Sequence, residues 1–366
     1  MIDYICPTCR ARHAVTLDRF RCDCGAPLSL DFEAAAIDRE ALSRRPLSIW
    51  RYREALPLAE DLAPASLGAG VAPLVDDTLG GIPVHLALEY VSPTGSFKDR
   101  GASLLVAVAA ALGAPLLVDD TSGNAGIALA AHAARAGLKA RVLVPDDASP
   151  AKPRIAAELG AEVVRVPGGR TAAAAAALEE AESGAFYASH ALSPFFLHGT
   201  KTAAYSIAEA LRWTAPGAVI VPVGNGGLAL GLDLGFREMR RHGLIDRRPA
   251  IVGVQAAACA PLRHAFEAGA TSPSPLVEAG TVADGVRVSS PPRGADILAA
   301  VRESGGSVEA VTEGEIEEAR RRLWRRGYAV ESTGAVAAAL VLRAGDDLRR
   351  RHGDLVVALT GSGLKL

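Results

Sequence analysis

The sequence predicts an α/β protein in which parallel sheets are covered by helices on both faces. Short apolar runs of strand length alternate with helix-length segments from about residue 82 to the end of the chain. The 366 residues exceed what a single core usually holds, which favours two such doubly wound domains. Four of the five cysteines lie near the N-terminus, which predicts a small additional segment there.

The composition excludes several classes of protein. Apolar residues make up 49% and charged residues 22%, as in an ordinary folded protein. A net charge of -2 gives no electrostatic reason to expect nucleic acid as a partner. The chain reaches cysteines and charges at once, and no stretch is apolar enough to span a membrane. We therefore expect a cytoplasmic protein with no nucleic-acid or membrane partner.

The N-terminal cysteines have spacings that suit a metal. Cys6 and Cys9 form a CxxC pair, and Cys22 and Cys24 form a CxC pair. In a reducing compartment, four clustered thiolates favour a structural zinc site over disulfides. We expect a zinc-ribbon-like segment over residues 1–30 with these four ligands. A metal-free remnant or an exposed thiol pair is the alternative.

The remaining elements follow in order along the chain. Residues 31–79 contain four prolines and are expected to form short helices and turns. Strands are predicted at residues 82–89, 115–118, 140–144, 162–166, 218–223, 250–255 and 355–360. Helices are predicted at residues 99–112, 125–136, 151–159, 171–182, 202–213, 228–241, 313–326 and 334–344. In such sheets ligands bind where strands end and helices begin, so the turns are the places to search.

One lysine stands out among these turns. Residues 92–101 read SPTGSFKDRG, which puts Lys98 at a predicted helix start directly after Phe97. Apolar surroundings and the positive helix end both disfavour an ammonium ion there. Lys98 is therefore a candidate amine for imine formation. The alternative is a surface lysine followed by Asp99 as an N-terminal helix acid.

Two further turns suit anions. Residues 120–126 read DTSGNAG, where hydroxyl and amide side chains and the amides near Gly123 could hold a carboxylate. An ordinary N-cap turn is the alternative there. Residues 224–231 read GNGGLALG, whose glycines let successive amides approach a phosphate. Because the spacing is neither GxGxxG nor that of a Walker motif, a smaller phosphorylated cofactor than NAD or ATP is favoured.

The last predicted strand ends at Thr360, within the segment TGSGLKL. A buried hydroxyl there can bond a heteroatom of a ligand ring. Its alternative role is that of a simple turn residue.

Taken together, SPTGSFKDRG, TSGNAG, PVGNGG and TGSGLK occur in the order typical of fold-type-II pyridoxal-phosphate enzymes, which share the fold of the tryptophan synthase β chain. Among these the chain most resembles the threonine synthase family, from about residue 70 to its end. A cysteine-rich ribbon occurs in part of that family. The resemblance implies a large cofactor-binding domain of residues 31–114 plus 194–366 and a small domain of residues 115–193.

The resemblance also implies roles for individual residues. Lys98 would form a Schiff base with pyridoxal 5'-phosphate and later act as the base at the α-carbon. Asn124 would bond the ring oxygen of the cofactor, and Thr360 would face its pyridine nitrogen. The substrate carboxylate would be held by Thr121, Ser122 and Gly123. The cofactor phosphate would be held by Gly224, Asn225, Gly226, Gly227 and the amide of Leu228.

The chain departs from the family where a substrate phosphate would bind. Ala125 stands where the family has a hydroxyl residue, and Leu228 stands where asparagine is common. In SHALSPFFLHGTKT, residues 189–202, Ala191 and Phe196 replace the serine and arginine of the family's NSxNPxRLEGQKT segment. Each change removes a donor from a buried dianion. His190, His198 and Arg287 are the candidates for substitute substrate contacts. The alternative role of His190 is that of a packing or capping residue, and Phe195 and Phe196 more simply indicate an apolar substrate wall.

These observations lead to three hypotheses. The first is a lyase or synthase that removes a β or γ leaving group from a small amino acid, with conversion of O-phosphohomoserine to threonine as the nearest named activity. The second is a serine or threonine dehydratase, or a β-replacement enzyme, acting on an unphosphorylated substrate. The third is a non-catalytic binding or regulatory protein. For a cytoplasmic enzyme a homodimer is the usual expectation.

Overall fold

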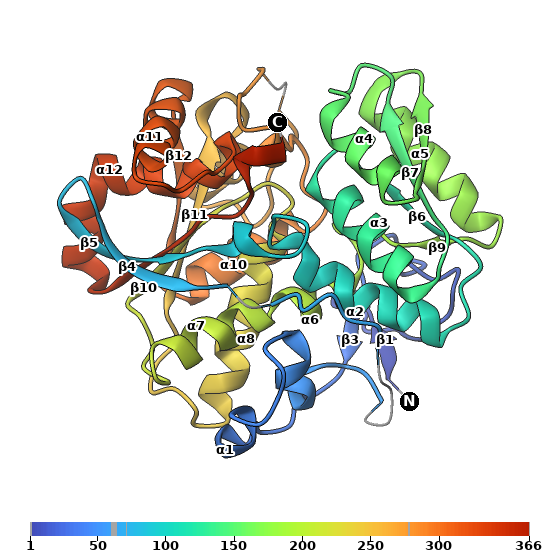
Figure 1. Ribbon diagram of the computed structural model, residues 1–366, viewed down its shortest axis with the longest axis horizontal. Coiled ribbons are helices and arrows are strands. Elements are labelled where there is room, and N and C mark those ends of the chain that lie inside the picture. Colours follow the sequence, from blue (N-terminus) through green and yellow to red (C-terminus); the bar gives the residue numbers. More distant parts are fainter. Residues whose placement is uncertain (1, 60–63, 71, 277–278, 366) are drawn as a thin grey trace. The chain divides into compact units, whose positions relative to one another are not determined.

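The computed structural model describes residues 2–59, 64–70, 72–276 and 279–365. The chain divides into two compact units (Figure 1). Unit 1 comprises Met1–Gly70 and Lys98–Thr200, and unit 2 comprises Val71–Phe97 and Lys201–Leu366. The predicted domains, 31–114 plus 194–366 and 115–193, divide the chain differently and remain a prediction.

Unit 1 begins with a small antiparallel sheet. Its strands are β1 (Asp3–Ile5), β2 (Arg12–Ala14) and β3 (Ser29–Asp31), in the order β2-β1-β3. The helix α1 (Arg39–Leu42) and the 3₁₀ helix η1 (Ile49–Ala55) follow. Tyr4 of β1 is buried and packs edge-on against Phe195, with 5.9 Å between ring centroids. This contact anchors the ribbon to the rest of unit 1.

The main sheet of unit 1 is wholly parallel, in the order β8-β7-β6-β9. Its strands are β6 (Leu117–Asp120), β7 (Ala140–Pro145), β8 (Glu162–Val166) and β9 (Phe186–Tyr187). The helices are α2 (Lys98–Ala111), α3 (Asn124–Ala136), α4 (Ala151–Glu158), α5 (Gly169–Glu182) and α6 (Pro194–Thr200). Strand order reverses between β6 and β9, so their carboxyl ends flank the switch point where ligands bind in such sheets.

Unit 2 is built on a six-stranded sheet in the order β12-β11-β10-β13-β5-β4. Its strands are β4 (Leu74–Leu79), β5 (Ile82–Ala87), β10 (Ala218–Pro222), β11 (Ala250–Ala256), β12 (Ser307–Val311) and β13 (Leu355–Ala358). All neighbouring strands run parallel except β4, which pairs antiparallel with β5. The order reverses between β10 and β13, which places the switch point of this sheet at their carboxyl ends.

Helices lie on both faces of the sheet in unit 2, as a doubly wound fold requires (Figure 1). The α-helices are α7 (Thr202–Ala210), α8 (Gly227–Arg241), α9 (Pro261–Glu267), α10 (Gly294–Glu303), α11 (Glu313–Arg325) and α12 (Ser332–His352). The 3₁₀ helices are η2 (Glu89–Val91), η3 (Ala257–Cys259), η4 (Asp284–Val286) and η5 (Gly363–Lys365). Every residue of β10, β11 and β13 is buried, which explains their continuous apolar runs.

A buried ion pair joins the first two helices of unit 2. Lys201 Nζ lies 2.7 Å from Glu238 Oε1, and the Tyr205 hydroxyl donates to Glu238 Oε2 at 2.9 Å. All three side chains are buried. Because the carboxylate is bonded at both oxygens, its charge is compensated inside the protein.

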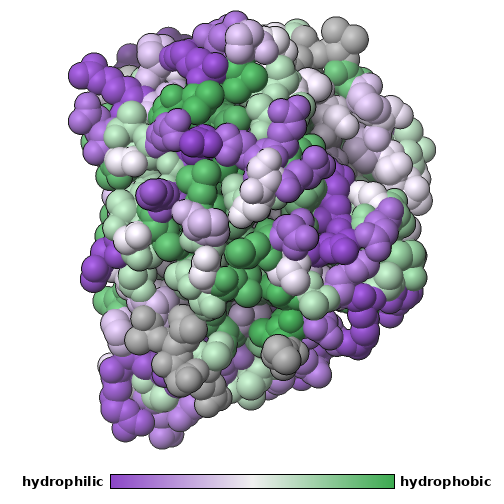
Figure 2. All heavy atoms as spheres, turned by 90° about the vertical axis from the view of Figure 1, so that its right-hand side faces the viewer, coloured by the Kyte–Doolittle hydropathy of each residue, from purple (hydrophilic) through white to green (hydrophobic). Residues whose placement is uncertain are grey.

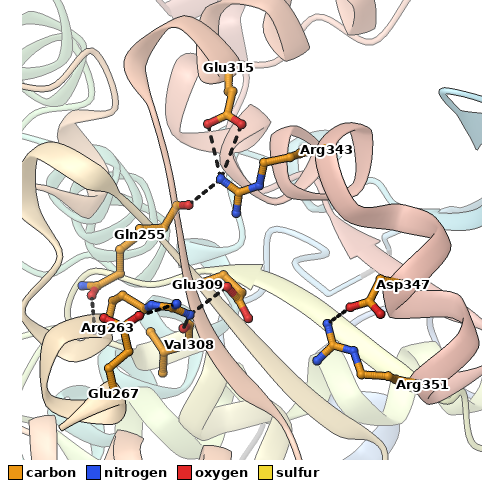
Figure 3. A network of polar contacts seen from close by, with 10 residues as sticks. Gln255, Arg263, Glu267, Val308, Glu309, Glu315, Arg343, Asp347 and Arg351 are labelled. Carbon is orange, nitrogen blue, oxygen red and sulfur yellow. Dashed lines mark hydrogen bonds and ion pairs between the residues drawn. The ribbon is translucent and has the colours of Figure 1, made fainter.

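A second polar network closes the outer edge of the same sheet (Figure 3). Arg263 of α9 binds Glu309 of β12 at 2.8 Å, and its backbone amide donates to Gln255 of β11. Arg343 of α12 bonds the Ala310 carbonyl at 2.9 Å and lies 3.4 Å from Glu315. These partly exposed contacts fasten the covering helices to the edge strand.

In Figure 2 hydrophilic and hydrophobic residues are interspersed over the face turned to the viewer, as is normal for protein surfaces. Among the described residues, no helix is both long enough and apolar enough to cross a bilayer.

Every strand and helix predicted between residue 82 and residue 360 is present, most with small shifts in their bounds, whereas the helix predicted at 334–344 extends to residue 352. Three strands of the two larger sheets and three α-helices of at least seven residues were missed: β4, β9, β12, α6, α9 and α10. Cys259, the fifth cysteine, is buried in unit 2.

Candidate active site

The lysine motif folds onto the C-terminal motif within unit 2. The Phe97 amide donates to the Thr360 carbonyl at 3.1 Å, and the Ser362 amide donates to the Gly95 carbonyl at 2.8 Å. Lys365 Nζ adds bonds to the carbonyls of Thr94 and Gly95. Two predicted motifs more than 260 residues apart in the sequence therefore form one layer beside the end of β13.

Lys98 is the next residue in the chain after Phe97 and the first residue of α2 in unit 1. Its Nζ lies 5.6 Å from the centroid of the Phe196 ring. Phe196 is buried against α2, where a Cβ on Gly101 would come within 2.5 Å of the ring. The glycine of the lysine motif thus lets the aromatic ring lie close to the lysine-bearing helix.

The predicted carboxylate loop follows β6 and leads into α3, as expected. Thr121 is buried, and its Oγ1 accepts a hydrogen bond from the Gly123 amide at 3.2 Å. Ser122, Gly123 and Asn124 are half-buried, and Asn124 is the first residue of α3. Gly123 is the N-cap, and no side chain in the described residues caps the helix there. The first amides of α3 are therefore arranged to bind an anion.

His190 and Asp119 meet at the switch point of the same sheet. Asp119 belongs to β6, and His190 follows β9 by three residues. Nδ1 of His190 lies 3.0 Å from Oδ2 of Asp119. The His190 ring also packs edge-on against Phe196, at 6.1 Å between centroids. His190 and Lys98 therefore both lie close to one aromatic ring.

Burial and charge shift the protonation of this pair. Burial raises the pKa of Asp119 to about 7, and the positive charge of Lys98 opposes the rise. Burial lowers the pKa of His190 well below its usual value, and the charge of Lys98 lowers it further. Burial also raises the pKa of Asp120, whose carboxylate accepts a hydrogen bond from Tyr187. Shifted titration of this kind is common where residues act on a ligand.

The predicted phosphate loop joins β10 to α8 in unit 2. Gly226 is the N-cap of α8, has φ +77°, and would bring a Cβ within 2.2 Å of Ile297. A Cβ on Gly224 would meet the Gly285 carbonyl at 2.7 Å, whereas one on Gly227 would meet nothing within 4 Å. No described side chain caps this helix, and the position of a Cβ on Gly227 is open. Such a start to a 15-residue helix suits a phosphate.

Thr360 and Leu228 are both buried. Thr360 follows β13, the neighbour of β10, so it lies at the same edge of the sheet as the glycine loop. Leu228 can offer a ligand only its amide. Ala125 is likewise buried and offers no side-chain donor.

The four N-terminal cysteines form one cluster. Their sulfur atoms all lie within 4.8 Å of one another, with 3.5 Å between Cys6 and Cys24 and 3.4 Å between Cys9 and Cys22. A tetrahedral zinc site with bonds of about 2.3 Å needs sulfurs about 3.8 Å apart. His13 Nε2 lies 3.3 Å from the Cys22 sulfur and was not predicted. The donor set and spacing fit a closed zinc site.

Comparisons with known proteins agree with these features. The family model described as "Pyridoxal-phosphate dependent enzyme" matches residues 66–361. A threonine synthase of Methanocaldococcus jannaschii is 34% identical over 372 residues, which cover 98% of this chain and 92% of that protein. A threonine synthase of Mycobacterium tuberculosis is 34% identical over 328 residues, which cover 87% of this chain and 89% of that protein.

Solved structures give the same fold. The threonine deaminase of T.th., known from a crystal structure, is 30% identical, with a TM-score of 0.66 over 80% of this chain and 92% of that one. Maize serine racemase, at 19% identity, has a TM-score of 0.69 over 80% and 88% of the two chains.

Proposed function

The chain belongs to the family of pyridoxal-phosphate dependent enzymes, and from this premise we propose that it eliminates or replaces a β or γ substituent of a small amino acid. It is a threonine synthase-like enzyme of fold type II. Family membership sets aside the hypothesis of a non-catalytic binding protein.

The residues of unit 2 fit the cofactor. The uncapped start of α8 offers amides to a phosphate, in a loop whose close neighbours would exclude side chains at Gly224 and Gly226. The hydroxyl of Ser96, two residues before Lys98, is buried with no hydrogen-bond partner among the described residues. When bound, the cofactor supplies an electron sink for the α-carbon of the amino acid. We assign its phosphate to residues 224–228 and its pyridine nitrogen to Thr360.

Lys98 has two tasks in this proposal. Its amine would hold the cofactor at the aldehyde group, and the same amine would take and return the proton at the α-carbon of the substrate. The Phe196 ring, 5.6 Å from Nζ, places an apolar surface beside this amine. Asn124 is assigned to the ring oxygen of the cofactor.

The loop after β6 is assigned to the substrate. Thr121, Ser122 and the first amides of α3 would hold its carboxylate, which fixes the α-carbon relative to the reacting groups. Ala125 and His190 would contact its side chain. The zinc proposed for Cys6, Cys9, Cys22 and Cys24 would be structural, since four protein ligands leave no open position.

The nearest named activity is the conversion of O-phosphohomoserine to threonine. A second candidate, dehydration of an unphosphorylated hydroxy amino acid, is favoured by Ala125 and Phe196, which lack the donors that a substrate phosphate needs. The likeness to a threonine deaminase structure is in keeping with it.

The observation that carries the proposal is the joining of residues 95–97 to residues 360–362, because it brings the lysine motif to the sheet edge that also bears the glycine loop. The test is incubation of the cofactor-loaded enzyme with O-phospho-L-homoserine, L-threonine and L-serine. Release of inorganic phosphate with formation of threonine supports the first activity, and ammonia with a keto acid supports the second. Absence of any turnover across such substrates would contradict the proposal.

A further inference from the structure

Asp119 and His190 form a polar pair at the switch point of the parallel sheet in unit 1. They come from the adjacent strand ends β6 and β9, at the edge of the sheet where the loop of residues 121–124 begins. Phe196 contacts both the His190 ring and Lys98 Nζ. The pair therefore lies in the part of unit 1 that would contact the side chain of an amino acid bound near Lys98.

The geometry of the pair leaves it able to accept a hydrogen bond from a ligand. The Asp119 side chain is 1% exposed, and its Oδ1 has no hydrogen-bond partner in the part of the chain that the structure describes. Its Oδ2 is 3.0 Å from His190 Nδ1. A neutral imidazole that donates from Nδ1 keeps Nε2 as an acceptor. An ionised Asp119 thus fixes the histidine tautomer that can accept a hydrogen bond.

The surroundings decide the charge of the pair. The groups that act on it are Lys98 of α2, Asp120 of β6 and Arg170 of α5, while Tyr187 of β9 bonds Asp120. Burial lowers the pKa of His190, so its ring is neutral at neutral pH. Burial raises the pKa of Asp119 to about 7, so the carboxyl ionises as the pH rises from 6 to 8.

We propose that Asp119 and His190 accept a hydrogen bond from a hydroxyl group on the substrate side chain and thereby select a hydroxy amino acid over its phosphate ester. The inference rests on the proposed function. His190 touches the hydroxyl, and Asp119 is a positioning residue that acts through His190.

A phosphate ester fits this corner poorly. A phosphate dianion offers only acceptors, which cannot bond to the acceptor atom of His190, and its charge is repelled by Asp119 and Asp120. Arg170 is exposed on α5 and is the cation whose charge also reaches the pair. It is therefore the residue through which a phosphate could bind if the inference is wrong.

The test measures binding to the cofactor-loaded enzyme, from the change in cofactor absorbance immediately after mixing. L-Serine, O-phospho-L-serine and L-alanine form one matched series, and L-homoserine, O-phospho-L-homoserine and L-2-aminobutyrate form another. In at least one series the hydroxy compound should bind about tenfold more tightly than the other two at pH 8, the value of one well-made hydrogen bond. This preference should weaken toward pH 6, as Asp119 becomes protonated.

Variants separate the two residues. His190→Ala should abolish the hydroxyl preference, and Asp119→Asn should remove its pH dependence. The matched control is Asp147→Asn, an exposed acid just beyond the carboxyl end of β7, which should leave the preference unchanged. In the cofactor-free protein, nitrogen NMR should show His190 protonated at Nδ1 at pH 8, and less so in Asp119→Asn.

Two results would overturn the inference. One is a phosphate ester that binds wild-type enzyme as tightly as the hydroxy compound, above all if Arg170→Gln abolishes that binding. The other is a hydroxyl preference that His190→Ala leaves intact. Covalent attachment of the cofactor to Lys98 is checked in every sample, so that failure of the proposed function is recognised separately.

Discussion

At the scale of single residues, Gly226 is held in a conformation that side chains rarely adopt. Its φ of +77° and the 2.2 Å that would separate an added Cβ from Ile297 leave no room for a methyl group. We predict that Gly226→Ala lowers the free energy of unfolding by about 1–3 kcal/mol and weakens cofactor binding, measured by urea unfolding and by cofactor titration.

Gly227→Ala is the matched comparison for stability, because a Cβ there meets nothing within 4 Å and its φ is not positive. It should unfold at the same urea concentration as the wild type or slightly higher, since alanine favours the helix. Equal destabilisation by the two alanines would contradict the account of this loop.

Asp119 should make stability depend on pH in an unusual direction. A carboxyl whose pKa rises from 3.8 unfolded to about 7 folded binds more protons in the folded state between these values. Stability from this group is therefore fully present below about pH 4 and is lost progressively as the pH rises to about 7. Relative to wild type, Asp119→Asn should gain about 2–3 kcal/mol of stability between pH 5 and pH 8.

Urea unfolding of both proteins at several pH values measures this difference. Taking the difference cancels the contributions of titrating groups that lie away from Asp119 and that the two proteins share. A gain that shrinks as the pH rises would show that Asp119 is not a carboxyl with a raised pKa.

At the scale of elements, the N-terminal ribbon depends on its sulfur cluster. Three strands of three residues each bury too little apolar surface to hold their shape unaided. We predict one zinc per chain by metal analysis and its loss in Cys22→Ser, with a lower midpoint of thermal unfolding. Cys259→Ala, which alters the buried cysteine of unit 2, should keep the zinc. The assignment would be refuted if wild-type protein that was expressed and purified in the presence of zinc contained no bound zinc.

Helices α7 and α8 are joined by the ion pair of Lys201 and Glu238. Lys201→Met removes the cation that lies 2.7 Å from the buried carboxylate while the Tyr205 hydrogen bond stays, and it should lower the free energy of unfolding by about 3–5 kcal/mol. The double variant Lys201→Met with Glu238→Leu removes the uncompensated charge and should recover much of the loss. A loss below about 1 kcal/mol in the single variant would mean that Glu238 becomes protonated at little cost.

Strands that are buried on both faces could be predicted from sequence, and other strands could not. β10 and β13 are continuous apolar runs, which burial on both sides demands. β12 carries Glu309 in its middle and lies at an edge of the sheet, so its pattern is polar. β9 has only two residues, too few for any periodicity. Because β9 was not predicted, the switch point between β6 and β9 could not be located from the sequence.

At the scale of the whole molecule, the residues that the sequence assigns to the site lie on turns. Glycine, serine and threonine at strand ends can be recognised from local sequence, so residues 121–124 and 224–228 could be proposed without the structure, and their roles stay a prediction. Asp119 could not be identified from the sequence. An acid at the end of an apolar strand is not informative by itself, and its partner His190 lies 71 residues further along the chain. The compact units also needed the structure, since each is built from two separate segments.

The central claim is that Lys98 bonds covalently to the cofactor. The most direct measurement is borohydride reduction of the enzyme with bound pyridoxal 5'-phosphate, followed by digestion and mass spectrometry. We predict that the peptide carrying Lys98 gains the mass of the reduced cofactor in a one-to-one ratio and that Lys98→Ala gains none. Labelling at Lys201 or Lys365 instead, or no labelling at all, would contradict the account.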